Sequence, residues 1–193
     1  MKSLNEASDQ PYSLLVAHQL VGTTVSVFVR ADFMNSIRQV EIASKKTGMG
    51  GMVGNKGSVA VKLNVLGANL CFVSSHFTAG QAAVTERDHD MFSAVAELQM
   101  SGGRGILDNE VVFWFGDLNY RIDLDREQVR HLILEKDYAT LFNGDQLQRR
   151  MREGLVFQNF KEEAISFAPT YKYDLGTNIY DSRYDSIHQT IEI

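Results

Sequence analysis

The segment "VVFWFGDLNYRID", residues 111–123, restricts the fold of this chain more than any other. It opens with an unbroken apolar run, residues 111–115, which is typical of a β-strand covered on both faces. Gly116 ends the run, and the polar residues Asp117 and Asn119 follow it. Residues two positions apart in an extended chain point to the same side, so the carboxylate and the carboxamide are predicted to lie together. Polar side chains at the end of a central strand are typical of a site for chemistry.

The composition indicates a soluble globular protein. Of the 193 residues, 44% are apolar and 22% are charged, which suits one substantial core. No apolar stretch approaches the roughly 20 residues that span a bilayer, and the polar start "MKSLNEASDQ" does not resemble a signal peptide, so we expect a cytoplasmic protein. Cys71, the single cysteine, lies in the apolar run "LCFV" and is expected to be a buried thiol. The net charge of −5 argues against general affinity for nucleic acids.

The spacing of apolar residues predicts further strands and helices. Strands are expected over residues 12–30, as two strands or one bent strand, and as antiparallel neighbours over 37–46, 58–66 and 69–75. Helices are expected over 81–100, 125–137 and 144–153. Asp125 is the expected N-cap of the second helix, with Leu132 and Leu134 on its buried side. The simplest packing is a sheet, or two stacked sheets, with helices on the outer faces.

A glycine-rich segment, "TGMGGMVGNKGS" at residues 47–58, separates two of these strands. Its five glycines can bring backbone amides close to an anion, although glycine content alone favours a mobile hairpin with irregular turns. Asn55 and Lys56 add an amide and a cation, which makes a phosphate-binding loop plausible. The apolar residues at its tip either fold back onto the core or contact an apolar partner, because large exposed apolar patches usually mark an interface. These tip residues are Met49, Met52 and Val53.

Two further polar features carry a weaker signal when each is taken alone. His76 ends the apolar strand "CFVSSH", where a lone histidine is more often part of a hydrogen-bonded core than a catalyst. Its position parallels that of Asp117, because both residues close strands that are expected to lie side by side. Tyr171 and Lys172 follow the rigid Pro169, and by themselves they indicate an ordinary aromatic edge.

Together these motifs resemble one family in order and spacing. The segments "TGMGGMVGNKGSVAVKL", "CFVSSHFTAGQ", "VFWFGDLNYRID" and "FAPTYKYD", with "QLVG" before them, are similar to those of the inositol-polyphosphate 5-phosphatases, most closely the central domain of the synaptojanins. The resemblance implies an α/β (α+β) fold of two packed β-sheets flanked by helices, the four-layer fold shared with pancreatic deoxyribonuclease and apurinic endonucleases. We expect the core of this catalytic domain over residues 12–181, an irregular start at 1–11 and a divergent tail at 182–193.

The resemblance also implies an activity. Enzymes of this family use magnesium to hydrolyse the 5-phosphate of phosphoinositides such as phosphatidylinositol 4,5-bisphosphate. The expected partner is therefore a phosphoinositide head group reached at the surface of a membrane from the cytoplasm, with no nucleic acid, and no protein partner is indicated. One alternative is a catalytically deficient fragment that binds a phosphoinositide or a partner. A nuclease of the same fold is a weaker alternative, because the chain has no basic strip to follow a phosphate backbone.

By the same resemblance, particular residues take particular roles. Asp117 would accept a proton from the attacking water, Asn119 would hydrogen-bond the phosphoryl oxygens, and His76 would donate to the scissile phosphate. This chemistry needs such groups because a charged phosphomonoester resists attack by unactivated water and its developing charge must be stabilised. The expected substrate-binding residues are Asn55 and Lys56 for the phosphate that links inositol to glycerol, and Tyr171 and Lys172 for the 4-phosphate. The expected membrane contacts are Met49, Met52 and Val53.

The sequence departs from the family pattern in two places. A metal-binding glutamate is expected before "QLVG", and a Ser-Asp-His motif is expected late in the chain, but neither motif is present. Glu41 and Glu86 do not lie where the glutamate motif would place it, so no metal ligand is assigned. We therefore expect an incomplete catalytic domain, partly uncovered apolar runs such as "VVFWF", and low stability and activity of this chain by itself.

Overall fold

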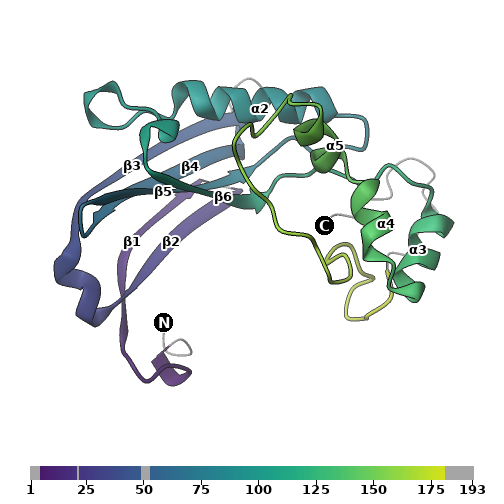
Figure 1. Cartoon of the computed structure of the whole chain (residues 1–193), viewed down its shortest axis with the longest axis horizontal. Helices are drawn as coiled ribbons and strands as arrows, with labels where there is room; N and C mark the ends of the chain where they lie inside the picture. Colours follow the sequence, from purple (N-terminus) through teal and green to yellow (C-terminus); the bar gives the residue numbers. More distant parts are fainter. Residues whose placement is uncertain (1–4, 21, 49–52, 181–193) are drawn as a thin grey trace. The chain divides into compact units, whose positions relative to one another are not determined.

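The computed structural model describes residues 5–20, 22–48 and 53–180 (Figure 1). The chain divides into two compact units, which are described separately below. The first comprises Met1–Phe77 and Asp90–Leu118, and the second comprises Thr78–His89 and Asn119–Ile193. Helix α2, Val84–Glu97, starts in the second unit and ends in the first. No helix in the described part of the chain is long and apolar enough to cross a membrane.

The first unit contains two β-sheets. Strands β1, Tyr12–Leu20, and β2, Thr23–Arg30, form an antiparallel pair. The second sheet has four strands in the order β3-β4-β5-β6, of which the first three are antiparallel neighbours, as predicted, while β6 is parallel to β5. These strands are Ile37–Gly48, Val53–Val65, Ala68–His76 and Val111–Asp117. Short 3₁₀ helices cover Ala31–Ser36, Ser101–Gly103 and Ile106–Asp108.

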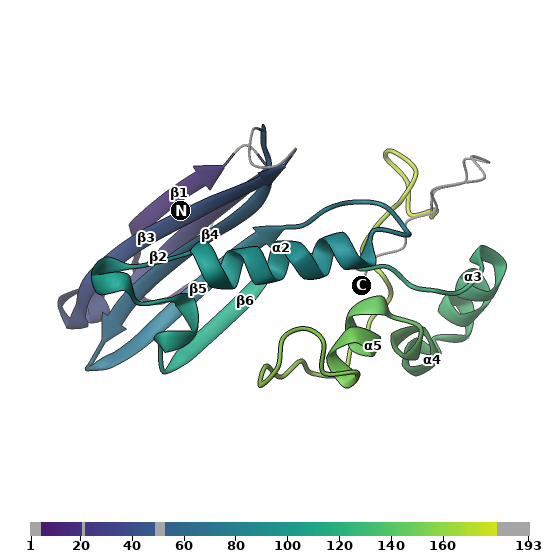
Figure 2. The ribbon, with the colours of Figure 1, turned by 90° about the horizontal axis from the view of Figure 1, so that it is seen from above.

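Strand β4 of the four-stranded sheet is covered on both faces, and its alternate residues point to opposite sides. Ala60 packs with Cys71 and Val73 against Ala94 of α2 and against Leu98, the residue after the end of α2, and α2 runs along one face of the sheet (Figure 2). The opposite face packs against β1 and β2 through a second cluster, formed by Leu20, Val25, Ile37, Val59, Val61 and Leu63. The predicted fold of two packed sheets with flanking helices is therefore confirmed. Cys71 is buried, also as predicted, and burial raises the pKa of its thiol to about 11.

Strand β6 corrects one prediction. Val112 and Trp114 pack against the cluster beneath α2, but Val111, Phe113 and Phe115 on the other face are 40%, 48% and 45% exposed. The reason is the position of β6 at the edge of the sheet. Strands β1 and β2 pack mainly over β4 and β5 and leave this face of β6 uncovered. Phe113 only stacks on Phe72, with ring centroids 5.1 Å apart. The expectation of a strand covered on both faces was therefore wrong, and that of a partly uncovered "VVFWF" run is confirmed.

The second unit contributes short helices around a small core of Ile122, Val129 and Leu141. Asp125 is the N-cap of α3 as predicted, and it accepts a hydrogen bond of 3.0 Å from the Gln128 backbone nitrogen. Leu134 is 80% exposed, so its predicted burial was wrong: it lies two residues from Leu132, and such residues point to different sides of a helix. The helices are α3, Arg126–Glu135, α4, Tyr138–Asn143, and α5, Gln146–Arg152. The six-residue α4 was not predicted, because it is too short to show a helical period.

Asp145, the buried N-cap of α5, gives a testable prediction about stability. Its carboxylate accepts a hydrogen bond of 2.9 Å from the Leu147 backbone nitrogen, but burial raises the pKa of Asp145 to about 6. Because this pKa is higher than in the unfolded chain, the ionised carboxylate destabilises the fold above about pH 6, and the cost falls as the pH is lowered. Asp145→Asn keeps an oxygen for the cap and should raise the free energy of unfolding by about 1–3 kcal/mol at pH 8.

Urea unfolding of the whole chain at pH 8 and pH 4 measures this effect. The gain should fall to about 0.5 kcal/mol at pH 4, where the folded carboxyl group is protonated and the unfolded one is about half protonated. Asp125→Asn is the matched control, because Asp125 caps α3 in the same way at an exposed position. An equal gain at both pH values would show that the charge of Asp145 is not the cause.

Candidate active site

Three of the predicted site residues meet at one end of the four-stranded sheet. His76 is the last residue of β5 and Asp117 is the last residue of β6, and they are direct partners in the parallel register. Lys56 lies on β4, immediately before Gly57, which pairs with His76 from the other side. The prediction that His76 and Asp117 close neighbouring strands is confirmed. A carboxylate, an imidazole and an ammonium group are thereby brought together.

The imidazole of His76 lies at the centre of this cluster. Its Nε2 is 2.5 Å from Lys56 Nζ and 3.2 Å from Asp117 Oδ2, while its Nδ1 is 2.9 Å from the carbonyl oxygen of Gly22. A carbonyl oxygen only accepts, so Nδ1 carries a hydrogen, and in the neutral ring Nε2 accepts from Lys56. The side chains of His76 and Asp117 are 24% and 46% exposed. The Nε2 edge of the ring and the carboxylate can therefore be reached by a substrate.

Two glycines make this arrangement possible. Gly116 has φ = +123°, and a Cβ there would lie 2.2 Å from the Ser75 carbonyl oxygen, so only glycine fits before Asp117. A Cβ on Gly22 would lie 2.2 Å from the Asn55 carbonyl oxygen and 2.9 Å from His76 Nδ1. Gly22 was not predicted as a site residue, although the motif "QLVG" contains it. Its contribution is a bare backbone that packs against Asn55 and accepts from His76.

Polar contacts behind the cluster hold the strand ends in place. Trp114 Nε1 donates to Ser75 Oγ over 2.9 Å, and Ser75 Oγ lies 2.7 Å from Ser58 Oγ, so one chain of side-chain contacts crosses β6, β5 and β4. Phe77 N donates to the Asp117 carbonyl oxygen over 3.0 Å, which continues the pairing past the end of β5. No local pattern marks these residues, because serines and tryptophans occur at many strand positions.

The glycine-rich segment differs from the prediction of a loop over residues 47–58. Strand β3 continues to Gly48 and β4 already starts at Val53, so Asn55 and Lys56 lie on a strand. Asn55 is exposed. Met49 and Met52 lie outside the described residues, and of Val53 only the backbone is described. The proposed membrane contact of these three residues remains a prediction.

The other predicted residues, Asn119, Tyr171 and Lys172, belong to the second unit. Asn119 is buried in the left-handed conformation, with φ = +59°, and its side-chain oxygen accepts a hydrogen bond of 2.6 Å from Arg121. Tyr171 is 45% exposed and Lys172 is half-buried. The Tyr180 hydroxyl donates to the Pro169 carbonyl oxygen over 2.6 Å, which stabilises the segment that carries Tyr171 and Lys172. Both side chains therefore lie on a structured part of the chain.

Comparison with known proteins identifies the family. Residues 1–188 match the family described as Endonuclease/Exonuclease/phosphatase family 2. The chain belongs to this family. It is 45% identical to human synaptojanin-1 over 174 residues, which are 90% of this chain and 11% of that protein. It is 44% identical over 171 residues to inositol-1,4,5-trisphosphate 5-phosphatase 1 of Schizosaccharomyces pombe, which cover 89% of this chain and 16% of that protein. The predicted resemblance is confirmed.

Solved structures of the family agree with this result. The inositol polyphosphate 5-phosphatase domain of SPsynaptojanin, crystallised in complex with inositol (1,4)-bisphosphate and calcium ion, superposes with a TM-score of 0.89 at 41% identity, covering 97% of this chain and 55% of that chain. Cimex nitrophorin, at 19% identity and a TM-score of 0.69, shares the fold alone. The chain thus spans about half of the matched phosphatase structure, and 11% to 16% of the two relatives named above.

The resemblance to the family implies a metal ion, which would need a group of ligand side chains. Residues 5–20, 22–48 and 53–180 contain no group of three or more His, Cys, Asp or Glu side chains that could hold a metal ion. Glu41, considered above as a substitute ligand, is already engaged: its two oxygens accept hydrogen bonds of 2.8 Å from Lys62 Nζ and 2.6 Å from Ser101 N. The described residues therefore do not form a metal site by themselves, and no step below is assigned to a metal.

Proposed function

We propose that this chain carries the chemistry of a phosphoinositide 5-phosphatase, which removes the 5-phosphate of lipids such as phosphatidylinositol 4,5-bisphosphate. The observation that carries the proposal is the convergence of Lys56, His76 and Asp117 at the ends of three adjacent strands. Two relatives support it, because they are named as a synaptojanin and an inositol 5-phosphatase. The matched crystal structure, which contains an inositol bisphosphate, supports the head group as the partner.

In the proposed mechanism, Asp117 accepts a proton from the water that attacks phosphorus, while the bond between phosphorus and the inositol oxygen breaks and that oxygen takes up a proton to leave as a hydroxyl group. Water is a weak nucleophile towards a phosphate that already carries negative charge, so a base and fixed donors are both needed. The proposed donors to the phosphoryl oxygens are the Asn119 amide and, when the ring carries two protons, His76 Nε2. Nδ1 cannot serve in this way because it is already directed at the Gly22 carbonyl oxygen. Gly22 therefore decides which nitrogen of His76 faces the substrate.

Further residues are proposed to bind the rest of the head group. Tyr171 and Lys172 would bind the 4-phosphate, and Asn55 with Lys56 would bind the phosphate that links inositol to glycerol. Because Lys56 Nζ contacts His76 Nε2 here, Lys56 has to leave the histidine to reach that second phosphate. We propose magnesium as the cofactor, supported by the calcium ion in the matched complex, with ligands unassigned. A lipid substrate further implies action at the cytoplasmic surface of a membrane, with Met49, Met52 and Val53 as contacts.

Release of phosphate from water-soluble dioctanoyl phosphatidylinositol 4,5-bisphosphate tests the proposal. Release is expected with Mg²⁺ but not with EDTA, and the lipid product should carry only the 4-phosphate by mass spectrometry. Sedimentation with vesicles that contain the lipid, without any release, would instead support a binding fragment. One observation is consistent with a binding fragment: the described residues contain no group of side chains that could hold a metal ion.

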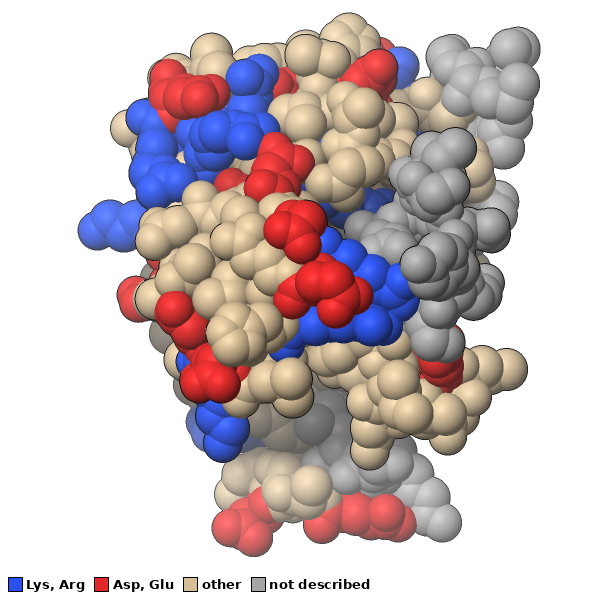
Figure 3. Space-filling view, turned by 90° about the vertical axis from the view of Figure 1, so that its right-hand side faces the viewer, with Lys and Arg blue, Asp and Glu red and all other residues tan. Residues whose placement is uncertain are grey.

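Cleavage of plasmid DNA would support a nuclease. Charge distribution argues against it, because basic and acidic side chains lie next to one another on the face in Figure 3. Arg149 of α5, for example, forms an ion pair of 2.7 Å with Asp123, and Arg150 pairs with Asp88. A protein that follows a phosphate backbone needs basic groups whose charge is not already neutralised by neighbours.

Lys172 gives a prediction about substrate choice. An ammonium group that binds the 4-phosphate makes a charge-assisted hydrogen bond, and its loss typically costs about 1.5–3 kcal/mol. Lys172→Ala should therefore lower kcat/KM about 10- to 100-fold on phosphatidylinositol 4,5-bisphosphate and hardly change it on phosphatidylinositol 5-phosphate. Lys161→Ala, at an exposed position in the same unit, is the control. An equal loss on both lipids would make Lys172 a structural residue.

A further inference from the structure

Arg121, two residues after Asn119, is a buried arginine that no role above explains. Its side chain holds Asn119 at two points: Nη2 donates to the side-chain oxygen Oδ1 over 2.6 Å, and Nε donates to the backbone oxygen over 3.0 Å. Both residues are almost fully buried, at 4% exposure for Arg121 and 5% for Asn119. A guanidinium group in this position fixes both the side chain and the left-handed backbone of Asn119.

This contact determines which end of the Asn119 amide faces a ligand. A guanidinium group has five N–H donors and no acceptor, so only the oxygen of the carboxamide can lie against it. The NH₂ group must then be directed away from Arg121. Phosphoryl oxygens accept hydrogen bonds and do not donate them, so an amide that binds a phosphate has to present its NH₂ group. The reversed amide would place two sets of donors against each other.

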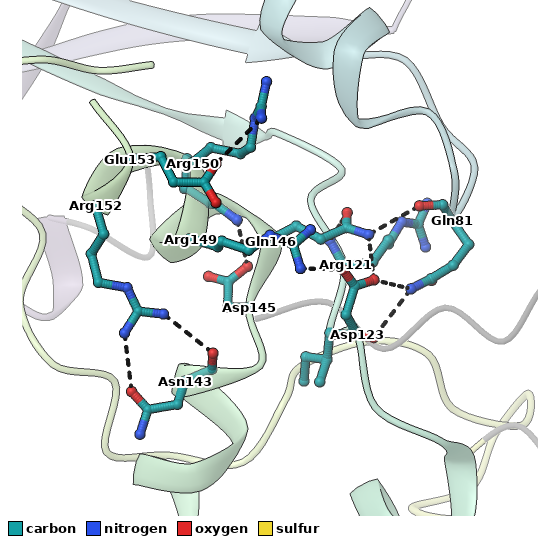
Figure 4. A network of polar contacts seen from close by, with 12 residues as sticks. Gln81, Arg121, Asp123, Asn143, Asp145, Gln146, Arg149, Arg150, Arg152 and Glu153 are labelled. Carbon is teal, nitrogen blue, oxygen red and sulfur yellow. Dashed lines mark hydrogen bonds and ion pairs between the residues drawn. The ribbon is translucent and has the colours of Figure 1, made fainter. Parts of the chain in front are cut away.

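Gln146 contacts the backbone of Arg121 and links it to three other groups in the interior of the second unit. Gln146 Oε1 accepts from the Arg121 backbone nitrogen over 3.0 Å and from Arg87 Nη2 over 2.6 Å. Gln146 Nε2 donates to the Gln81 carbonyl oxygen over 3.0 Å and to Asp123 Oδ1 over 2.7 Å (Figure 4). Gln146 thereby connects α5, the start of α2 and the segment after Asn119. One amide side chain satisfies four polar partners in the interior of the second unit.

Two buried guanidinium groups near each other are costly for stability. Arg87 has no exposed surface, and burial followed by repulsion from Arg121 lowers the pKa of Arg87. Arg87 is held by the Gly80 carbonyl oxygen at 2.7 Å and lies over the Tyr120 ring at 5.1 Å. Buried charges are weak contributors to stability, because the loss of hydration offsets most of the attraction. The need to hold the Asn119 side chain in one orientation explains why Arg121 is present despite this cost in stability.

We propose that Arg121 is a positioning residue for phosphate binding: it fixes the Asn119 amide with its NH₂ group towards the phosphoryl oxygens, and Gln146 holds the backbone of Arg121 in place. The proposal rests on the proposed function, in which Asn119 binds those oxygens. Arg121 does not touch the substrate in this scheme. Its effect on catalysis therefore passes entirely through Asn119.

A double-mutant cycle in the whole chain tests the proposal. Arg121→Lys retains the charge but cannot donate to both the side chain and the backbone of Asn119 as the guanidinium group does. It should lower kcat/KM for hydrolysis of the 5-phosphate about 10- to 100-fold, mainly through kcat. In an Asn119→Ala background the same change should have no further effect. A similar loss in both backgrounds, or a loss below twofold in the wild-type background, would overturn the proposal.

Arg152→Lys is the matched control. Arg152 holds Asn143 by the same two kinds of contact, to Oδ1 at 3.4 Å and to the backbone oxygen at 3.3 Å (Figure 4), but Asn143 has no proposed role. Its kcat/KM should stay at the wild-type value. A loss equal to that of Arg121→Lys would show that any such arginine supports activity through the fold, which would also overturn the proposal.

Nuclear magnetic resonance of the ¹⁵N-labelled protein gives a result that does not depend on activity. The Asn119 side-chain amide, assigned by its loss in Asn119→Ala, should have an order parameter typical of rigid backbone, about 0.85. A value below about 0.6 would mean that Arg121 does not fix the amide and would overturn the proposal. If the wild-type chain releases no phosphate, the proposed function fails, and a lower order parameter of this amide in Arg121→Lys than in the wild type still decides whether Arg121 positions Asn119.

Discussion

Replacing Asp117 with asparagine is expected to slow 5-phosphate hydrolysis about 10²- to 10⁴-fold, the usual contribution of a general base. Asparagine has the same shape as aspartate but does not accept a proton at neutral pH. The side chain of Asp117 is 46% exposed, so the substitution should leave the fold intact. It should also leave KM for dioctanoyl phosphatidylinositol 4,5-bisphosphate within about threefold, because the proposed role of Asp117 is in the reaction rather than in binding.

Initial rates of phosphate release with Mg²⁺ measure this effect, with thermal unfolding as the check on folding. Asp9→Asn, at an exposed position in the first unit, is the control and should have wild-type activity. If Asp117→Asn keeps more than one third of the wild-type kcat, Asp117 is not the base. The other carboxylates of the described residues would then have to be tested in turn.

Glu41→Gln should produce the largest loss of stability, about 3–5 kcal/mol, which is typical of breaking a buried ion pair. Lys62 is buried in β4, and its Nζ donates to Glu41 Oε1 over 2.8 Å. The hydrogen bond from Lys62, together with that from Ser101, lowers the pKa of Glu41 to about 2. Because this pKa lies below that of the unfolded chain, the stabilisation is complete above about pH 4.5 and is lost as the pH falls towards 2.

Guanidinium unfolding at pH 7 and pH 3 measures this loss. Glu97→Gln is the matched control, because Glu97 pairs with Lys45 at a partly exposed position. Loss of this ion pair should lower the free energy of unfolding by less than about 1 kcal/mol. The double variant Glu41→Gln with Lys62→Met should recover part of the lost stability, because it removes the uncompensated buried charge. Equal small losses for Glu41→Gln and Glu97→Gln would show that burial of Lys62 does not strengthen its pair.

The features that the sequence predicted well are those with a local signal. Alternating apolar residues predicted the antiparallel strands, and a polar residue within three positions of the end of an apolar run marked His76 and Asp117 as the ends of β5 and β6. Since both residues end strands of one sheet, their contact followed from the pairing of the strands. The N-cap at Asp125 was predictable for the same reason, because a helix cap depends only on the next few residues.

Features that depend on distant partners could not be predicted in this way. Arg87, Arg121 and Gln146 have residue types that are usually exposed, and only the folded chain shows that they are buried together. The contact of Gly22 with His76 joins residues 54 positions apart. Apolar content likewise could not show that one face of β6 is uncovered, because that depends on how far β1 and β2 extend over the sheet.

The parallel pairing of β6 with β5 has a consequence for the order in which the chain folds. Strands β3, β4 and β5 are consecutive and antiparallel, so each pairing closes a short loop, whereas β6 joins only after the chain has passed through α2. Pairings that close longer loops lose more chain entropy and form more slowly. We therefore expect Lys56 and His76 to meet early in folding and Asp117 to join them last, so that the proposed catalytic base marks the final step in assembly of the sheet.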